Sequence, residues 1–270
     1  MNSVWLSTSI SLISMLLAAV IGMRSRAMLR EHHKNVETTD LLRVTVTMLV
    51  TFAAIVLGLL ITSSKANFDT ADDAMQTYAA VLSDLDDALQ SAGPAAAPIR
   101  QQLAQYTAAA IASTWTTQPP PPGNYYPRNI VNGDDGMMYE SQSLGDLLRK
   151  INAEILQLPA QTPDQGEVKA SCAAAMSEVL QQRWTTIEAS QISLSTPIFI
   201  VLVFWLFIVF MCLGLNTPVN AVSLITIALG AVALASALFV VVDLNGLYSG
   251  IFIISSEPMR GALAQMLSNS

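Results

Sequence analysis

An uncharged run from Thr45 to Ser64 constrains this chain more than any other feature. About 20 predominantly apolar residues in a helix cross the hydrocarbon core of a bilayer. The run leads into an amphipathic stretch, 67–90, and no turn signal separates the two. We therefore expect one long helix that crosses the membrane and continues beyond it.

Three further uncharged runs are long enough to cross a bilayer, at 4–23, 197–215 and 219–242. They explain why only 12% of the residues are charged, whereas a soluble domain has about 25%. The predicted fold class is all-α, with a four-helix transmembrane bundle and a helical domain outside the membrane. Extensions of the second and third membrane helices form part of that domain.

The predicted divisions follow these runs. They are a first transmembrane helix (1–23), a basic loop (24–41), a second transmembrane helix (42–64), an acidic helical domain (65–196), a third transmembrane helix (197–215), a short loop (216–220), a fourth transmembrane helix (221–243) and a tail with a short amphipathic helix (244–270). Within the acidic domain, apolar residues spaced by three and four predict helix seams. Two such seams are Met75, Tyr78, Leu82, Leu85, Leu89 and Leu144, Leu147, Ile151, Ile155, Leu158.

Charge predicts the orientation, because short cytoplasmic loops of membrane proteins are enriched in Lys and Arg. The segment 24–43 holds five basic residues, whereas 65–188 holds seven basic and fifteen acidic residues. We expect the basic loop and the 216–220 loop to be cytoplasmic. The N-terminus, the 65–196 domain and the 244–270 tail are expected to be extracytoplasmic. A sequence pI near 4.7 gives no reason to expect a nucleic acid partner.

Small and hydroxyl-bearing residues form one face on three of the predicted membrane helices. Such faces let helix backbones approach closely in lipid, so they are interpreted first as packing seams. The alternative is that some hydroxyls line a water-filled path. The candidates for packing or pore lining are Ser7, Ser11, Ser14, Thr47, Thr51, Gly58, Thr226 and Gly230. The third run carries five large aromatic residues instead, which favours a lipid-facing helix with few close neighbours.

Asp243 is a candidate functional charge, because ionisable residues within a membrane span mark functional sites. Its place at the end of a run also allows a simpler interpretation, a carboxylate solvated at the interface. A second acidic group lies mostly off the first helix seam of the outer domain. Its members form a candidate partner surface, Asp72, Asp73, Asp84 and Asp87.

Catalytic and metal-binding patterns are not found in the sequence. The two histidines, His32 and His33, lie in the predicted cytoplasmic loop, so no base is expected near the outer hydroxyls. The pair Asp134 and Asp135 lacks the alternating acids of a calcium loop. We therefore expect no enzyme, no metal and no cofactor, and no disulfide between Cys172 and Cys212.

Segments spread over nearly the whole chain resemble those of a known family. They are Val56–Ile61, Ser63–Lys65, Phe68–Thr70, Leu85–Asp86, Leu89, Gly93–Pro94, Arg100, Leu103, Trp115, Arg183–Trp184, Ser195–Pro197, Val203–Leu206, Ser249–Gly250, Ser255–Arg260 and Ala262–Leu263. On these segments the chain resembles the bacterial bestrophin-like domain family, small integral membrane proteins of largely uncharacterised function. One departure follows the fourth membrane run. The family usually has an Asp-Arg-Pro-Phe type stretch there, whereas this chain has Asn245–Tyr248.

The resemblance implies a multi-pass protein of the bacterial inner membrane and a relation to bestrophins, which are pentameric anion channels with a cytosolic soluble part. Two hypotheses follow. The first is a homo-oligomeric anion channel or pore in the bilayer, with the hydroxyl-bearing faces near the path. The second rests instead on the absence of charges in the membrane runs and of catalytic patterns. It is a structural or accessory subunit of a larger membrane complex, which docks through its acidic outer domain and its membrane seams.

Overall fold

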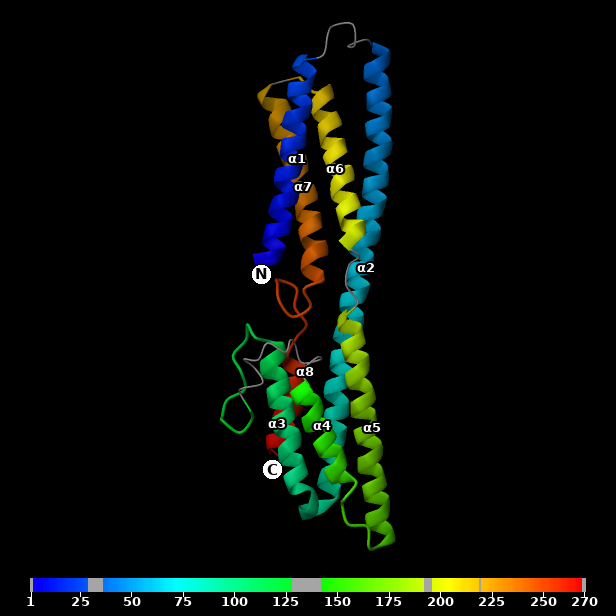
Figure 1. Cartoon of the computed structure of the whole chain (residues 1–270), viewed down its shortest axis with the longest axis vertical. Helices are drawn as coiled ribbons and strands as arrows, with labels where there is room; N and C mark the ends of the chain where they lie inside the picture. The colour runs from blue at the N-terminus through cyan, green and yellow to red at the C-terminus, as the bar shows by residue number, and fades with distance from the viewer. Residues whose placement is uncertain (1, 29–35, 128–141, 192–195, 219, 269–270) are drawn as a thin grey trace. The chain divides into compact units, whose positions relative to one another are not determined.

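A computed structural model of the chain describes residues 2–28, 36–127, 142–191, 196–218 and 220–268. Every regular element in these ranges is a helix, as predicted (Figure 1). In chain order they are α1 (Asn2–Met28), α2 (Val36–Ser91), the short 3-10 helix η2 (Gly93–Ala96), α3 (Ala97–Thr114), α4 (Gln142–Ile155), α5 (Pro163–Gln191), α6 (Thr196–Asn216), α7 (Ala221–Leu244) and α8 (Glu257–Ser268).

The predicted long helix is confirmed, because α2 runs without a break through the uncharged run and the amphipathic stretch after it. Among the described residues, four helices are long and apolar enough to cross a membrane, with spans Val4–Arg26, Asp40–Ser91, Pro197–Asn216 and Ala221–Leu244. Three sequence interpretations lie outside the described residues. They concern His32 and His33, Asp134 and Asp135, and the junction 192–195 between α5 and α6.

The chain divides into two compact units. The membrane unit comprises Met1–Asn67 and Ser193–Phe252, and the helical unit comprises Phe68–Ile192 and Ile253–Ser270. The helical unit therefore contains residues 68–192 of the predicted 65–196 domain together with the C-terminal segment, which the sequence indicates only as a tail with a short helix. The predicted amphipathic helix of that tail is α8.

All four helices of the membrane unit contribute to one apolar core. Its buried members are Met15, Ala18, Ala19, Ala53, Leu57, Leu60, Leu202, Leu206, Phe210, Ile227, Ala231, Leu238 and Val241. The expectation that the third membrane helix has few close neighbours is wrong, because α6 packs one face into this core. Only its other faces are exposed, as at Ile200 and Phe204.

Two glycines allow α1 and α6 to touch backbone to backbone. A Cβ on Gly22 would contact the carbonyl oxygen of Met211 and lie 2.9 Å from the backbone nitrogen of Leu215. A Cβ on Gly214 would contact the carbonyl oxygen of Ala19 in the same way. This close approach replaces side-chain interdigitation with backbone contact, as small residues permit in membrane helices.

The helical unit is built on the predicted seams. Met75, Tyr78, Leu82, Leu85 and Leu89 of α2 are all fully buried. The predicted seam of α4 is wrong at one position, because Leu148 is fully buried and the predicted Leu147 is only half-buried, whereas the other four predicted residues are buried. Leu148 continues the spacing of four and three that links the helix's other buried residues.

The C-terminal segment packs onto α3. The indole Nε1 of Trp115 donates to the carbonyl oxygen of Ile254 at 2.8 Å. The Nη2 of Arg260 donates to the carbonyl oxygen of Pro119 at 2.7 Å. The Oγ1 of Thr107 contacts the Sδ of Met266 at 3.7 Å. The N–H group of the buried Trp115 indole therefore has a hydrogen-bond acceptor, as buried tryptophans usually do.

Candidate functional site

The small residues of α1 pack inside the protomer. Ser11 is 2% exposed, Gly22 is buried, and Ser7 and Ser14 are half-buried. The hydroxyl of Ser11 donates to the carbonyl oxygen of Ser7 at 2.9 Å, so the helix satisfies it internally. These serines lie within the packed bundle.

The small residues of α2 are exposed, unlike those of α1. We call Thr47, Thr51, Ala54, Gly58 and Thr62 the α2 small face, and all five are exposed in the protomer. At 100° per residue the set occupies one narrow side of the helix. A Cβ on Gly58 would meet nothing within 4 Å among the described residues. This face is therefore open in the membrane unit.

The rest of α2 in the membrane is divided between two other faces. Ala53, Leu57 and Leu60 point into the core. Large apolar side chains occupy the remaining side, with Ile55 55% exposed and Leu59 65% exposed. Large exposed apolar side chains such as these are expected on a surface that faces lipid. The α2 small face differs from it in carrying three hydroxyls and no large side chain.

The hydroxyls of the α2 small face are bonded to their own helix. Thr47, Thr51 and Thr62 each donate to the carbonyl oxygen four residues earlier, at 2.8, 2.8 and 3.0 Å. A hydroxyl has one proton to donate and two acceptor lone pairs. Each threonine therefore presents its oxygen as an acceptor, which suits a water molecule.

The candidates on α7 are also exposed. Thr226 donates its hydroxyl to the carbonyl oxygen of Val222 at 2.9 Å, and a Cβ on Gly230 would meet no described atom within 4 Å. Large apolar residues lie beside them, with Leu229 66% exposed. Thr226 and Gly230 therefore interrupt the apolar surface of α7 over a shorter stretch than the α2 small face interrupts that of α2.

Asp243 is not solvated at a helix end, contrary to the simpler sequence interpretation. The residue is 1% exposed. Its Oδ2 accepts hydrogen bonds from the backbone N–H groups of Ile251 and Phe252, at 2.9 and 2.8 Å. A buried carboxylate needs such donors, because its desolvation is otherwise costly. The loop that supplies them follows α7 by only a few residues, which the helix pattern of the sequence does not reveal.

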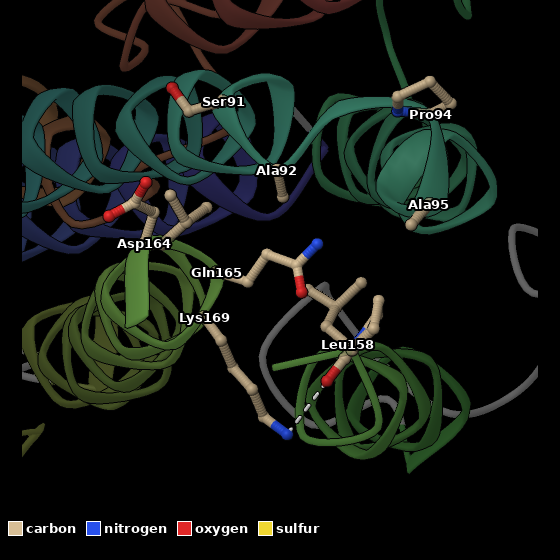
Figure 2. Close-up of a pocket in the computed structure, with 10 residues that line it drawn as sticks. Ser91, Ala92, Pro94, Ala95, Leu158, Asp164, Gln165 and Lys169 are labelled. Carbon is tan, nitrogen blue, oxygen red and sulfur yellow. Dashed lines mark hydrogen bonds between the residues drawn. The ribbon is translucent and has the colours of Figure 1, made fainter. Parts of the chain in front are cut away.

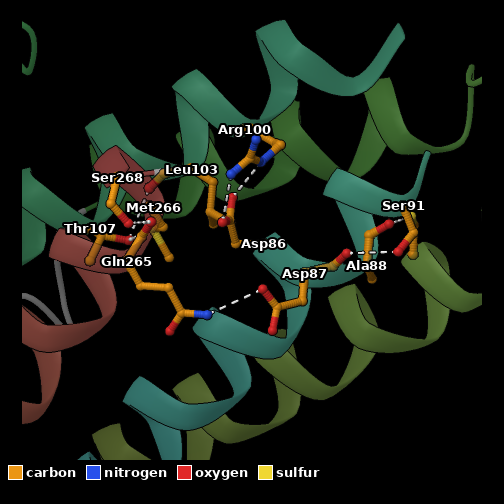
Figure 3. Close-up of polar contacts among 11 residues, drawn as sticks. Asp86, Asp87, Ala88, Ser91, Arg100, Leu103, Thr107, Gln265, Met266 and Ser268 are labelled. Carbon is orange, nitrogen blue, oxygen red and sulfur yellow. Dashed lines mark hydrogen bonds and ion pairs between the residues drawn. The ribbon is translucent and has the colours of Figure 1, made fainter. Parts of the chain in front are cut away.

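The candidate acidic surface is only partly open. Asp73 and Asp84 are exposed, and Asp72 accepts from the side chain of Gln76 at 2.9 Å. Figure 3 shows Asp87 accepting from Gln265 of α8, at 3.2 Å. The four residues are therefore not one free patch, because Asp87 also holds α8.

The neighbouring Asp86 differs from these four acids, and the sequence marks it only as a family position. It is fully buried, and both its oxygens accept from Arg100 of α3 at 2.8 Å (Figure 3). The two parallel N–H···O bonds match the planar guanidinium to the carboxylate. The hydrogen bond to Asp86 also raises the pKa of Arg100 above its usual value. The pair joins α2 to α3 across the turn at η2.

A second buried polar cluster joins three helices of the helical unit. The hydroxyls of Tyr78 on α2 and Tyr106 on α3 lie 2.5 Å apart, and both residues are fully buried. Burial raises the pKa of each tyrosine, although the nearby charge of Arg183 on α5 lowers both pKa values in part. The sequence marks Tyr78 only as a seam position and Arg183 only as a family position, so it does not reveal this cluster.

The raised tyrosine pKa values predict a loss of stability in alkali. The unfolded chain ionises its tyrosines near pH 10, while the folded chain keeps Tyr78 and Tyr106 protonated, so the unfolded state gains stability as pH rises above about 10. The expected loss is on the order of 1 kcal/mol per pH unit for the pair. Urea unfolding at pH 9, 10 and 11 measures it. The variant Tyr78→Phe/Tyr106→Phe should show a smaller loss, and an equal loss would contradict the assignment.

A cavity of about 410 Å³ lies in the helical unit where α2, α4 and α5 end or begin (Figure 2). The ammonium group of Lys169 donates to the carbonyl oxygen of Leu158 at 3.1 Å. The Oε1 of Gln165 accepts from the backbone of Gln161 at 2.9 Å. Both polar groups therefore hold the connection between α4 and α5, and none of the sequence-predicted site residues lines the cavity.

Comparisons with known proteins identify relatives of the whole fold. A family model described as the bestrophin-like domain matches residues 10–259. The crystal structure of a bacterial bestrophin homologue from Klebsiella pneumoniae, a single-substitution variant, has a TM-score of 0.64 at 13% identity, over 97% of this chain and 98% of that chain. Two crystal structures of membrane protein variants have TM-scores of 0.52 and 0.50, each at 13% identity, over 96% and 97% of this chain and 97% of each of theirs. Curated protein sequences give no significant match.

Proposed function

The chain belongs to the bestrophin-like domain family, and from this premise we propose that it forms an oligomeric membrane pore for small anions. The α2 small face is the observation that carries the proposal. It is exposed along the uncharged run, it carries hydroxyls, and it differs from the apolar side of the same helix. In a ring of identical copies, this face of α2 lines the central path.

The chemistry of the face favours a hydrated ion. The three threonines keep their protons on their own helix, so their outward oxygens accept hydrogen bonds from water. Direct donation to an anion would require breaking these bonds, at a net cost of about 0.5–1.5 kcal/mol each. The path is therefore a wet one, in which the ion keeps most of its water shell.

Lys65 supports anions as the conducted species. It is exposed and follows Thr47 by eighteen residues, which is five helical turns, so it continues the α2 small face where the uncharged run ends. Rings of Lys or Arg draw anions into pores. No charged residue occupies α2 between Val44 and Ser64, so Lys65 is the first charge after the uncharged run.

The experiment that tests the proposal combines mass and flux. The mass of the purified protein is measured in a mild detergent, and the same preparation is reconstituted into vesicles loaded with chloride. We expect a closed homo-oligomer and chloride efflux that exceeds efflux from empty vesicles. Recovery in a fixed ratio with other membrane proteins, without efflux, would favour the accessory-subunit hypothesis and its contact surface at Asp73 and Asp84.

The proposed orientation places the chain in a bacterial inner membrane with the helical unit outside. We expect a cysteine in place of Ala170, exposed on α5, to react with a membrane-impermeant maleimide in intact spheroplasts. A cysteine in place of Asp40, exposed near the start of α2, should react only after the membrane is opened. The reverse pattern would put the helical unit in the cytosol, as in bestrophins.

A further inference from the structure

The chain after α7 folds back on itself around Asp243. The backbone N–H of Gly246 donates to the carbonyl oxygen of Asp243 at 2.9 Å, and the N–H of Ser249 donates to the carbonyl oxygen of Gly246 at 2.8 Å. The chain then returns to the carboxylate, whose Oδ2 accepts from the N–H groups of Ile251 and Phe252. These charge-assisted bonds fix the loop to the end of the helix.

Gly250 makes this return possible. Its φ is +145°, a conformation that other residues rarely adopt. A Cβ at this position would also contact the carboxylate of Asp243, with the Cγ atom at 2.9 Å. Both the backbone conformation and the space therefore require glycine, and the carboxylate lies directly against the loop backbone.

In the loop after α7, two apolar residues are buried and two are exposed. Leu247 and Tyr248 are buried in the membrane unit, with 8% and 4% exposed. Ile251 and Phe252 point away from it, with 63% and 43% exposed. Because their N–H groups lie within 3 Å of the Asp243 carboxylate, these exposed side chains return to the level where the uncharged run of α7 ends.

An aromatic pair marks this end of the bundle as a membrane boundary. The ring of Trp5, 53% exposed near the start of α1, lies 4.9 Å from the ring of Phe239, about one turn before Asp243. Trp is enriched where a membrane protein meets the headgroup region. The apolar surface of α7 thus continues into the loop at the depth of the interface.

We propose that Asp243 is a positioning residue which holds the loop so that Ile251 and Phe252 insert into lipid. The two side chains form an interfacial anchor that extends the lipid-facing surface of α7. The partner is the boundary between acyl chains and headgroups, and the anchor does not depend on whether the protein conducts ions.

The test uses nitroxide spin labels on the full chain in lipid vesicles, with both native cysteines replaced by alanine. A label at Ile251→Cys reports its collision rates with oxygen, which concentrates in lipid, and with a nickel chelate, which stays in water. Leu229→Cys, on the exposed apolar side of α7, is the lipid reference. Leu156→Cys, exposed in the helical unit, is the water reference.

We expect the label at 251 to collide more often with oxygen than with nickel, with a ratio between those of the two references. A ratio equal to that of the label at 156 would overturn the proposal, and so would protection from both reagents, which indicates a protein partner. Adding Asp243→Ala should raise the mobility of the label and its nickel collisions. Asp243→Asn, which keeps an acceptor oxygen, should change both much less. Unchanged spectra in both variants would exclude Asp243 as the tether.

Discussion

Replacing Gly22 with valine is expected to destabilise the membrane unit strongly. The new side chain would meet the carbonyl oxygen of Met211 and the backbone of Leu215, which cannot rotate away as a side chain could. Overpacking of a core costs about 1–3 kcal/mol, and contact with backbone places this variant at or above the upper value. The midpoint of thermal unfolding in detergent measures the effect.

Two further glycine variants test whether the loss of stability comes from the contact between α1 and α6. Gly214→Val lies at the same helix crossing and should destabilise to a similar extent. The two substitutions should also be less than additive together, because the first already separates α1 from α6. Gly230→Val is the matched control on α7, since a Cβ there meets no described atom within 4 Å. Equal melting of Gly22→Val and Gly230→Val would contradict the close approach of α1 and α6.

Arg100→Ala is expected to destabilise the helical unit by about 3–5 kcal/mol. The substitution leaves the carboxylate of Asp86, which is fully buried, without the guanidinium that donates to both of its oxygens. Unfolding by urea measures the loss, and the fluorescence of the buried Trp115 reports on the same unit.

The controls for Arg100 separate a buried pair from an exposed one. Arg149 and Asp146 also form an ion pair, but their side chains are 72% and 67% exposed, so Arg149→Ala should cost no more than about 1 kcal/mol. The double variant Asp86→Ala/Arg100→Ala should be more stable than Arg100→Ala alone, because no buried charge is left. A double variant that is less stable than the single one would contradict this explanation.

The helices could be predicted from the sequence because their signals are local. Uncharged runs and spacings of three and four predicted the four membrane helices and the buried seam of α2 from Met75 to Leu89. The predicted seam of α4 was wrong at one position, since Leu147 and Leu148 are adjacent and equally apolar. Periodicity alone does not choose between two such neighbours.

The contacts between distant segments could not be predicted. Asp86 and Asp87 are neighbours in an acidic stretch, yet one is buried against Arg100 and the other holds α8 through Gln265. The burial of Asp243 depends on a loop whose donors are backbone N–H groups, which every residue except proline carries. The packing of α6 against α1 depends on two glycines that meet across a crossing, and only the folded bundle brings them together.

The most direct test of a pore lined by α2 is the modification of a cysteine in place of Thr51, in vesicles loaded with chloride and with both native cysteines replaced by alanine. Thr51 lies on the α2 small face, and Leu59 lies on the large apolar side of the same helix. If the small face lines the path, a charged methanethiosulfonate reagent reacts at position 51 and stops chloride efflux, whereas a cysteine at position 59 stays unmodified. An unreactive cysteine at position 51, or a modified one that leaves efflux unchanged, would contradict the pore.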